Sequence, residues 1–474
     1  MRTAERNLTK LIISFVLSLL LCFQPYLGVP RASALSAEEE RIMGEQFLIQ
    51  IRQTLDLLDD DYAQQYVNAL GQYLLKSVEV KYWPFHFYLV KDNDLNAFAG
   101  PGGHIFMFSG LINEMDEIDE VAAVMCHEIA HVTARHLSHR IDQSKNLGWA
   151  TLAGILAGIL IGGSAGAAIM AGSQAASLQA QLHYSREDER QADQLGFKYT
   201  DQSTFDPAGL IAGLNKIQKN QWIGTDTIPP YLLTHPTGPE RISSLDIMLR
   251  DYSKPPDSPE AARFRALWPF FKTIVRAKSL EPRDAERVFN RELEKNPDSG
   301  LAHFGLGLVM NEKSEYDLAI AHFQKALLTQ PKSVPVLRSL GTSYQMKGQD
   351  AEAIAVLEKA LRIDPQDVSL SFLLAFSYQN LQKYKEAIRL YERLVAMNAA
   401  SIQVFYNLGV SYGKEGKLAL AHYNFGVYFK RLGKRGKAMF HFQKAEELAK
   451  NDPALKGRIK NAMKGLYPEG SKPD

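Results

Sequence analysis

The motif His-Glu-x-x-His at residues 127–131 constrains this chain more than any other feature, because it predicts a helix and a metal site together. Residues four apart lie on the same face of a helix, so His127 and His131 can present two imidazoles to one cation. Glu128 then lies beside the position that a catalytic zinc ion leaves open for water, where a carboxylate can accept a proton. The motif predicts one Zn²⁺ per chain and a general base; the alternative is a helix with two unrelated histidines.

A third metal ligand must come from elsewhere, because the chain has no histidine at the spacing of the extended HExxHxxGxxH motif. The best candidates lie in a charged segment further along, where Glu189 and Asp193 are four apart and share a helical face. Glu189 would bind the metal, and Asp193 would hydrogen-bond a ligating imidazole. Position alone leaves Glu187 and Asp188 as competitors of Glu189.

The length of 474 residues exceeds one ordinary hydrophobic core, so we expect two or three domains. The net charge of +1 argues against a nucleic-acid-binding protein. The N-terminus has basic residues, the apolar run 11–23 and then Ala32-Ser33-Ala34, which is the order of a secretory signal at 1–34. We expect cleavage after Ala34. An uncleaved anchor is the alternative, but the apolar run is shorter than the roughly 20 residues that a span needs.

The cysteines agree with export of a chain without disulfides. Cys22 lies inside the predicted signal, so Cys126 is the one cysteine left and no intramolecular disulfide is possible. Cys126 is next to a predicted ligand, but a small buried hydrophobe is the better interpretation.

The segment before the motif predicts two helices over 36–76 and two strands, at 83–90 and 103–109. A small sheet of this kind could pair its edge with an extended substrate, although it could equally just support the helix. The residues that would form this substrate edge are Asn96, Ala97 and Phe98. His104, in the second strand, is expected at the surface.

Residues 146–182 lie between the two metal-binding segments and contain no Lys, Arg, Asp or Glu. Glycines recur there at intervals of four, at 154, 158, 162 and 166, which would give one helix face close backbone contact. We favour a mobile helical hairpin over the site. A bilayer contact through 147–172 and plain buried core are the alternatives.

A proline-rich stretch at 252–262 predicts a linker, and we expect few contacts to cross it, so that each half folds alone. Beyond it, small residues and prolines recur every 34 residues, the period of the tetratricopeptide repeat. The repeating residues are Pro297, Pro331 and Pro365, Gly307 and Gly341, and Ala319, Ala353 and Ala387, with weaker matches at Ala285, Phe289, Gly409, Ala438 and Phe442. Proline ends each second helix, which a coiled coil, the alternative, would not tolerate. We expect an all-α superhelix over 263–466 whose concave groove binds a protein partner.

Four separated motifs carry a resemblance to a known family. They are Asn-Ala-Phe-Ala-x-Pro-Gly-Gly at 96–103, HExxH at 127–131, Ser-Arg-x-x-Glu-x-x-Ala-Asp at 185–193, and Thr-His-Pro at 234–236 with Glu-Arg-Ile at 240–242. Over roughly residues 40–250 the chain resembles the metallopeptidases that include the integral-membrane CaaX proteases and heat-shock HtpX. It is most similar to their soluble, exported branch with tetratricopeptide repeats, the BepA-like proteases.

The resemblance implies roles for named residues and for the chain. It implies the zinc ligands His127, His131 and Glu189, the general base Glu128 and the outer carboxylate Asp193. Gln191 departs from the family, which commonly has an acid there, and we expect it to face solvent. The resemblance also implies quality control or assembly of outer-membrane proteins in a periplasm.

Together these features predict a mainly α protein, with an α+β zincin-like metalloprotease domain over 35–251 and an all-α superhelix after it. The expected activity is that of an exported zinc endopeptidase on polypeptide substrates, with partner or substrate selection by the repeats. The alternative is a chaperone or assembly factor whose zinc site is structural or latent. Glu128 favours the enzyme, because a structural zinc site has no use for a base.

His235 is a candidate regulator. Pro236 biases its backbone away from helix, so we expect a histidine displayed on a loop. It could act as a fourth ligand that displaces the catalytic water, or as a stabiliser of the oxyanion. The simpler alternative is that His235 caps the helix beginning near Glu240.

Overall fold

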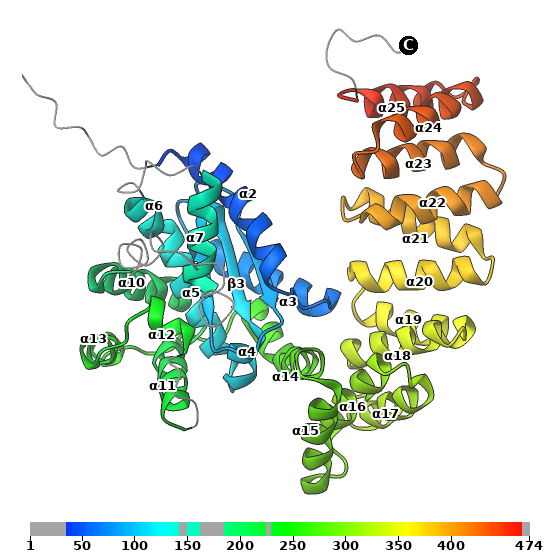
Figure 1. Cartoon of the computed structure of the whole chain (residues 1–474). Coiled ribbons are helices and arrows are strands. Elements are labelled where there is room, and N and C mark those ends of the chain that lie inside the picture. Colours follow the sequence, from blue (N-terminus) through cyan, green and yellow to red (C-terminus); the bar gives the residue numbers. More distant parts are fainter. Residues whose placement is uncertain (1–34, 142–148, 162–183, 224–228, 467–474) are drawn as a thin grey trace, which may run out of the picture.

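A computed structural model of the chain describes residues 35–141, 149–161, 184–223 and 229–466 (Figure 1). The predicted signal lies outside these residues, so its prediction stays untested. The described residues form an N-terminal half, with helices around a small sheet, and a C-terminal array of stacked helices. This arrangement confirms the predicted fold class.

The N-terminal half begins with a helix whose start the sequence dictates. Ser36 and Glu39 form a reciprocal capping box, in which the Ser36 hydroxyl accepts from the Glu39 N–H at 3.1 Å and the Glu39 carboxylate accepts from the Ser36 N–H at 2.8 Å. The helices of this half are α2 (Ala37–Thr54), α3 (Asp61–Leu74), α4 (Ser109–Glu114), α5 (Ile118–Thr133), α6 (His136–Ile141), α7 (Trp149–Ile161), α10 (Arg186–Gln202), α11 (Ala208–Ile223), α12 (Pro230–Thr234) and α13 (Pro239–Leu249), with short 3-10 turns at Leu75–Ser77 and Pro101–Gly103.

Three strands form the sheet, in the order β1-β3-β2. They are β1 (His86–Val90), β2 (Ala97–Gly100) and β3 (His104–Phe108). The central strand β3 runs parallel to β1 and antiparallel to β2. Both predicted strands are therefore present, and the motif that carries the candidate substrate edge forms a third strand beside them.

The position of β3 explains why the expectation of a surface His104 is wrong. His104 begins the central strand and is 7% exposed, with its Nδ1 3.2 Å from the Tyr88 hydroxyl. Burial lowers the pKa of His104 to about 4, so the ring is neutral at pH 7.

The candidate substrate edge is covered in this structure. Strand β2 lies at the edge of the sheet, but Ala97 and Phe98 are fully buried and α7 packs against the strand. The Asn96 side-chain amide donates to the last carbonyls of α7, at 3.0 Å to Leu160 and 3.1 Å to Ile161. Substrate pairing along this edge stays a prediction, and it would require α7 to leave.

The described part of the glycine-rich segment is buried core. Helix α7 packs against α2, with Ala153, Leu156 and Ala157 fully buried. A β-carbon at Gly154 would meet nothing within 4 Å, so this glycine makes no close backbone contact. Among the described helices, none has both the length and the hydropathy that crossing a bilayer requires. The hairpin and bilayer interpretations of 162–182 lie outside the described residues.

The C-terminal half is a stack of paired helices (Figure 1). Its helices are α14 (Pro259–Ser279), α15 (Pro282–Lys295), α16 (Gly300–Glu312), α17 (Tyr316–Thr329), α18 (Val334–Met346), α19 (Asp350–Ile363), α20 (Val368–Asn380), α21 (Tyr384–Ala396), α22 (Ile402–Lys414), α23 (Leu418–Arg431), α24 (Arg435–Leu448) and α25 (Pro453–Met463). Pro297, Pro331 and Pro365 each lie just beyond the end of a second helix. Gly307 permits the close packing inside a repeat, because a β-carbon there would lie 2.5 Å from the Phe323 ring.

Helix α14 joins the two halves into one core, so the expectation that few contacts cross the linker is wrong. Trp268, Phe271 and Ile274 of α14 are buried in the same hydrophobic cluster as α3, α4 and α5. Tyr66 of α3 stacks on the Phe271 ring, with centroids 4.2 Å apart, and its hydroxyl donates to the Phe264 carbonyl at 2.8 Å. The composition of the linker does not predict this packing, because the apolar residues that pack against the N-terminal half lie after the linker, on α14.

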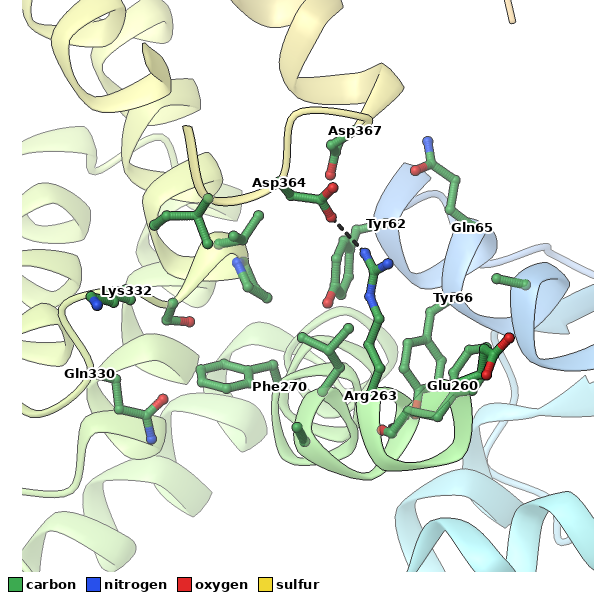
Figure 2. Close-up of a pocket in the computed structure, with 18 of the residues that line it drawn as sticks. Tyr62, Gln65, Tyr66, Glu260, Arg263, Phe270, Gln330, Lys332, Asp364 and Asp367 are labelled. Carbon is green, nitrogen blue, oxygen red and sulfur yellow. Dashed lines mark hydrogen bonds and ion pairs between the residues drawn. The ribbon is translucent and has the colours of Figure 1, made fainter. Parts of the chain in front are cut away.

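A cavity of about 800 Å³ lies where α3, α14 and the repeats meet (Figure 2). Tyr62 and Tyr66 enter it from α3, and Phe270 enters from α14. The Arg263 guanidinium on α14 pairs with Asp364, after α19, at 2.6 Å across the cavity rim. The halves are thus joined by polar as well as apolar contacts.

A truncation series tests the role of α14. A fragment spanning 35–279 should unfold at a higher temperature than one spanning 35–251. Removing α14 exposes the surface that buries Trp268 and Phe271, and each such side chain contributes about 1.5–3 kcal/mol. Thermal unfolding followed by circular dichroism measures the difference. Equal midpoints would mean that α14 belongs to the repeats alone.

Candidate metal centre

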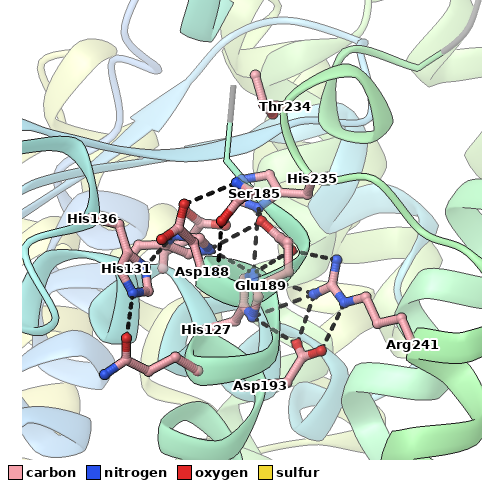
Figure 3. A network of polar contacts seen from close by, with 12 residues as sticks. His127, His131, His136, Ser185, Asp188, Glu189, Asp193, Thr234, His235 and Arg241 are labelled. Atoms are coloured by element: carbon pink, nitrogen blue, oxygen red, sulfur yellow. Dashed lines mark hydrogen bonds and ion pairs between the residues drawn. The ribbon is translucent and has the colours of Figure 1, made fainter. Parts of the chain in front are cut away.

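Helices α5 and α10 lie against each other and present the predicted site residues on facing surfaces (Figure 3). Gly196 allows this approach, because a β-carbon at that position would lie 3.1 Å from the His127 Cα. Ser185 fixes where α10 begins, through a capping box with Asp188. The start of α10 in turn fixes which of its acids face α5.

The structure brings four possible ligands together: His127, His131, Glu189 and His235. One ligand atom from each lies within 4.8 Å of the others, and all four residues are buried. The Nε2 atoms of His127 and His131 are 3.0 Å apart. Glu189 Oε1 lies 3.4 Å from His131 Nε2 and 3.0 Å from His235 Nδ1. Imidazole nitrogens with one carboxylate form a donor set that zinc accepts.

The charges around this cluster fit one divalent cation. Three carboxylates are buried here, those of Glu128, Glu189 and Asp193, and the Arg241 guanidinium contacts the last two. One guanidinium leaves two negative charges, and neither oxygen of Glu128 has a hydrogen-bond partner among the described residues. Burying unpaired carboxylates costs several kcal/mol each, so a dication within reach would stabilise this arrangement strongly.

The pKa shifts of the site residues are caused by burial and by these same charged groups. Burial raises the pKa of Glu128. Burial would also raise that of Glu189, but His235 and Arg241 outweigh it and hold the pKa of Glu189 well below its usual range. Burial and Arg241 lower the pKa of His127, yet Asp193 and Glu189 overcome them and raise it to about 9. A proton on His127 therefore provides a positive charge that stabilises the neighbouring carboxylates, as a metal cation would. Protons thus compete with a metal ion for this site.

Asp193 and Arg241 hold His127 and Glu189 in place. Asp193 Oδ1 lies 3.1 Å from His127 Nδ1, on the side of the ring away from the other ligands. Arg241 donates through Nε and Nη2 to the two Asp193 oxygens, both at 2.8 Å, and its Nη1 lies 2.6 Å from Glu189 Oε2. Asp193 thus contacts the His127 ring, and its role as an outer carboxylate stays a prediction. The sequence did not predict a role for Arg241, because an Arg at the start of a helix usually faces solvent.

His235 lies in the cluster, but not as the sequence suggested. It is fully buried at the C-terminal end of α12, and its ring stacks on Tyr231 with centroids 4.5 Å apart. The expected display on a loop is therefore wrong. The capping alternative is also wrong, because Gly238 is the N-cap of α13 and no side chain caps that helix. The position near Glu189 suits a fourth ligand, and the role itself stays a prediction.

His136 and Gln191 were not expected here. Gln191 is exposed, as predicted, yet its side-chain oxygen lies 2.9 Å from His136 Nε2. The other ring nitrogen of His136 lies 3.0 Å from His131 Nδ1. The contact with His136 was not expected. It arises because α6, which begins at His136, packs against α5. The available signal in the sequence was His136 itself, the first histidine after HExxH.

The other candidate residues in or near the two segments have different partners. Glu187 is exposed and pairs with Arg190. Asp188 caps α10 and pairs with Arg140, so neither acid competes with Glu189. Cys126 is fully buried, and burial raises its pKa to about 12, which agrees with a packing role.

Family comparisons agree with this division of the chain. Residues 61–249 match the model of "Peptidase family M48". Tetratricopeptide repeat models match 275–335 and 419–452, and the model of "Anaphase-promoting complex, cyclosome, subunit 3" matches 312–394.

Several curated proteins are similar to part of the chain. The "Beta-barrel assembly-enhancing protease" of Escherichia coli O157:H7 is 31% identical over 222 residues, covering 46% of this chain and 45% of that protein. The protein of the same name in Yersinia pestis is 31% identical over 223 residues, covering 46% of each. "Mitochondrial metalloendopeptidase OMA1" of Arabidopsis thaliana is 32% identical over 153 residues, covering 32% of this chain and 29% of that protein. The chain thus spans about half the length of the first relatives.

Two substitutions on α10 test the assigned roles. Glu189→Gln should weaken Zn²⁺ binding by more than Asp193→Asn, because the first changes a ligand and the second changes a partner of a ligand. Loss of such a partner typically costs 10- to 100-fold in metal affinity. Zinc retained after dialysis against a chelator measures both variants. The reverse order would mean that Asp193, and not Glu189, faces the metal.

Proposed function

We propose that this chain, whose residues 61–249 form a peptidase family M48 domain followed by tetratricopeptide repeats, is a zinc-dependent endopeptidase. The observation that carries the proposal is the buried ligand set with Glu128 beside it. The similarity to proteins named as a protease and a metalloendopeptidase supports it. His127, His131 and Glu189 would hold the zinc ion.

Zinc, when bound at such a site, polarises a carbonyl and activates a water molecule as a nucleophile. Glu128 would accept the proton of that water and pass it to the departing amine. Its surroundings suit this work: the carboxylate is fully buried, its oxygens have no hydrogen-bond partner among the described residues, and burial raises its pKa. Arg241 and Asp193 would keep His127 and Glu189 in their orientations throughout.

The substrates we propose are polypeptides of the cell envelope. The relatives' name, beta-barrel assembly-enhancing protease, supports a role in the assembly or quality control of outer-membrane proteins. A predicted N-terminal export signal supports action in the periplasm. The repeats would bind a partner or substrate segment, since stacked helix pairs form extended concave surfaces.

One observation favours a second function, that of a chaperone or assembly factor with a latent site. His235 lies within the ligand cluster, where a fourth protein ligand would leave no room for the water. Its Nε2 also lies 3.5 Å from Glu128 Oε1, so it occupies the space in front of the base. We infer that His235 closes the site in the resting enzyme. If the site were closed permanently, the protein would act as a chaperone or assembly factor only.

Replacing the base tests the chemistry. Glu128→Gln should abolish peptide cleavage, by a factor of about 10² or more, and should keep the zinc content of the wild type, because the three ligands are intact. Cleavage of an unfolded protein substrate and metal analysis on the same samples measure both. Cleavage at the wild-type rate would exclude the protease mechanism.

Replacing His235 tests the closure. If His235 is an inhibitory ligand, His235→Ala should raise basal cleavage or self-cleavage several-fold and should retain most of the zinc, because three ligands remain. If it serves the transition state, the same change should lower kcat instead. Cleavage rate and zinc content, measured together, separate the two. Unchanged kinetics would leave His235 a packing role only.

A further inference from the structure

We propose that His136 and Gln191 form a hydrogen-bonded relay that fixes the tautomer and orientation of the metal ligand His131. The proposal rests on the zinc site proposed above and assigns two positioning residues to it. Neither residue is a candidate metal ligand. His136 contacts His131 at the ring nitrogen that faces away from the other candidate ligands, and the side-chain oxygen of Gln191 contacts His136.

The backbone places His136 for this purpose. Helix α5 ends at Thr133, and Arg135 then adopts a left-handed conformation with φ of 55°. Helix α6 begins at His136, directly after this residue, and packs against α5. The His136 ring packs edge-on against the His131 ring, with centroids 5.0 Å apart, and is 2% exposed. The left-handed conformation of Arg135, which is unfavourable for a residue other than glycine, thus directly precedes the residue that makes this buried contact with His131.

The direction of each hydrogen bond follows from the metal outward. His131 faces the cluster with Nε2, and a ligating nitrogen carries no proton, so a neutral His131 has its proton on Nδ1. That N–H donates to His136 Nδ1, 3.0 Å away. His136 must then carry its own proton on Nε2, which donates to the Gln191 oxygen at 2.9 Å. The reverse orientation of the Gln191 amide would put an N–H against an N–H, so the metal-bound state requires the oxygen.

The two histidine ligands are therefore held in different ways. His127 Nδ1 meets the Asp193 carboxylate directly. His131 meets a neutral imidazole and then a neutral amide. A neutral relay orients the ring without adding charge to a cluster in which Arg241 and a dication already balance three carboxylates. The amide oxygen is the one group of Gln191 that the relay uses.

The test is competition for Zn²⁺ between the full-length chain and a chromophoric chelator. Gln191→Leu removes the acceptor and should weaken zinc binding about 10-fold or more. Gln194→Leu is the matched control, because Gln194 is exposed on the same helix and contacts no ligand; its affinity should equal the wild type. Gln191→Glu restores an acceptor oxygen and should bind zinc at least ten times more tightly than Gln191→Leu. Equal affinities for Gln191→Leu and Gln194→Leu overturn the proposal.

The tautomers provide a readout that a purely structural role would not move. In the zinc-loaded wild type, ¹⁵N–¹H correlation spectra of the histidine rings should show a proton on Nδ1 of His131 and on Nε2 of His136. A zinc-loaded protein with the His136 proton on Nδ1 overturns the relay and leaves the zinc site standing. A wild type that binds no Zn²⁺ overturns the proposed function and the relay with it.

Discussion

The burial of three carboxylates around one guanidinium is the constraint on which the rest of this structure depends. Glu128, Glu189 and Asp193 are almost fully removed from solvent, and Arg241 can offset one of their charges. Carboxylates without partners are excluded from protein interiors by several kcal/mol each. A dication between His127, His131 and Glu189 would balance the remaining charge. Under the proposed function, activity and stability would both depend on that ion.

Much of this site follows from the sequence alone. Helical periodicity in HExxH places His127, Glu128 and His131 together on α5. The i, i+4 spacing of Glu189 and Asp193 puts both acids on the face of α10 that meets these residues. The residues that the sequence analysis missed act at a distance along the chain. Arg241 reaches the site from α13, and His136 reaches it through a left-handed turn at Arg135. Periodicity in the sequence cannot predict such contacts, because they form only when α6, α10 and α13 pack together in the folded protein.

The fold class of each half could be predicted from the sequence, but the packing between the halves could not. The 34-residue period gave the repeats, because proline and glycine have positional meaning in paired helices. The linker at 252–262 suggested independent halves, but the apolar face of α14 begins just after it and packs against α3. His104 was expected at the surface because one strand alone does not reveal whether it is central. Movement of the repeats relative to the site would thus have to work against the packed joint at α14 and the ion pair between Arg263 and Asp364.

The most direct test of this account is titration of metal-free full-length protein with Zn²⁺, followed by thermal unfolding at each zinc concentration. The account predicts one Zn²⁺ per chain and a melting temperature that rises with free zinc, equivalent to about 2.7 kcal/mol at a concentration 100 times Kd. It also predicts proton release on binding, because His127 must give up its proton to become a ligand. A protein that takes up no zinc, or whose melting temperature does not change with zinc, would contradict the claim that the buried carboxylates are held by a metal.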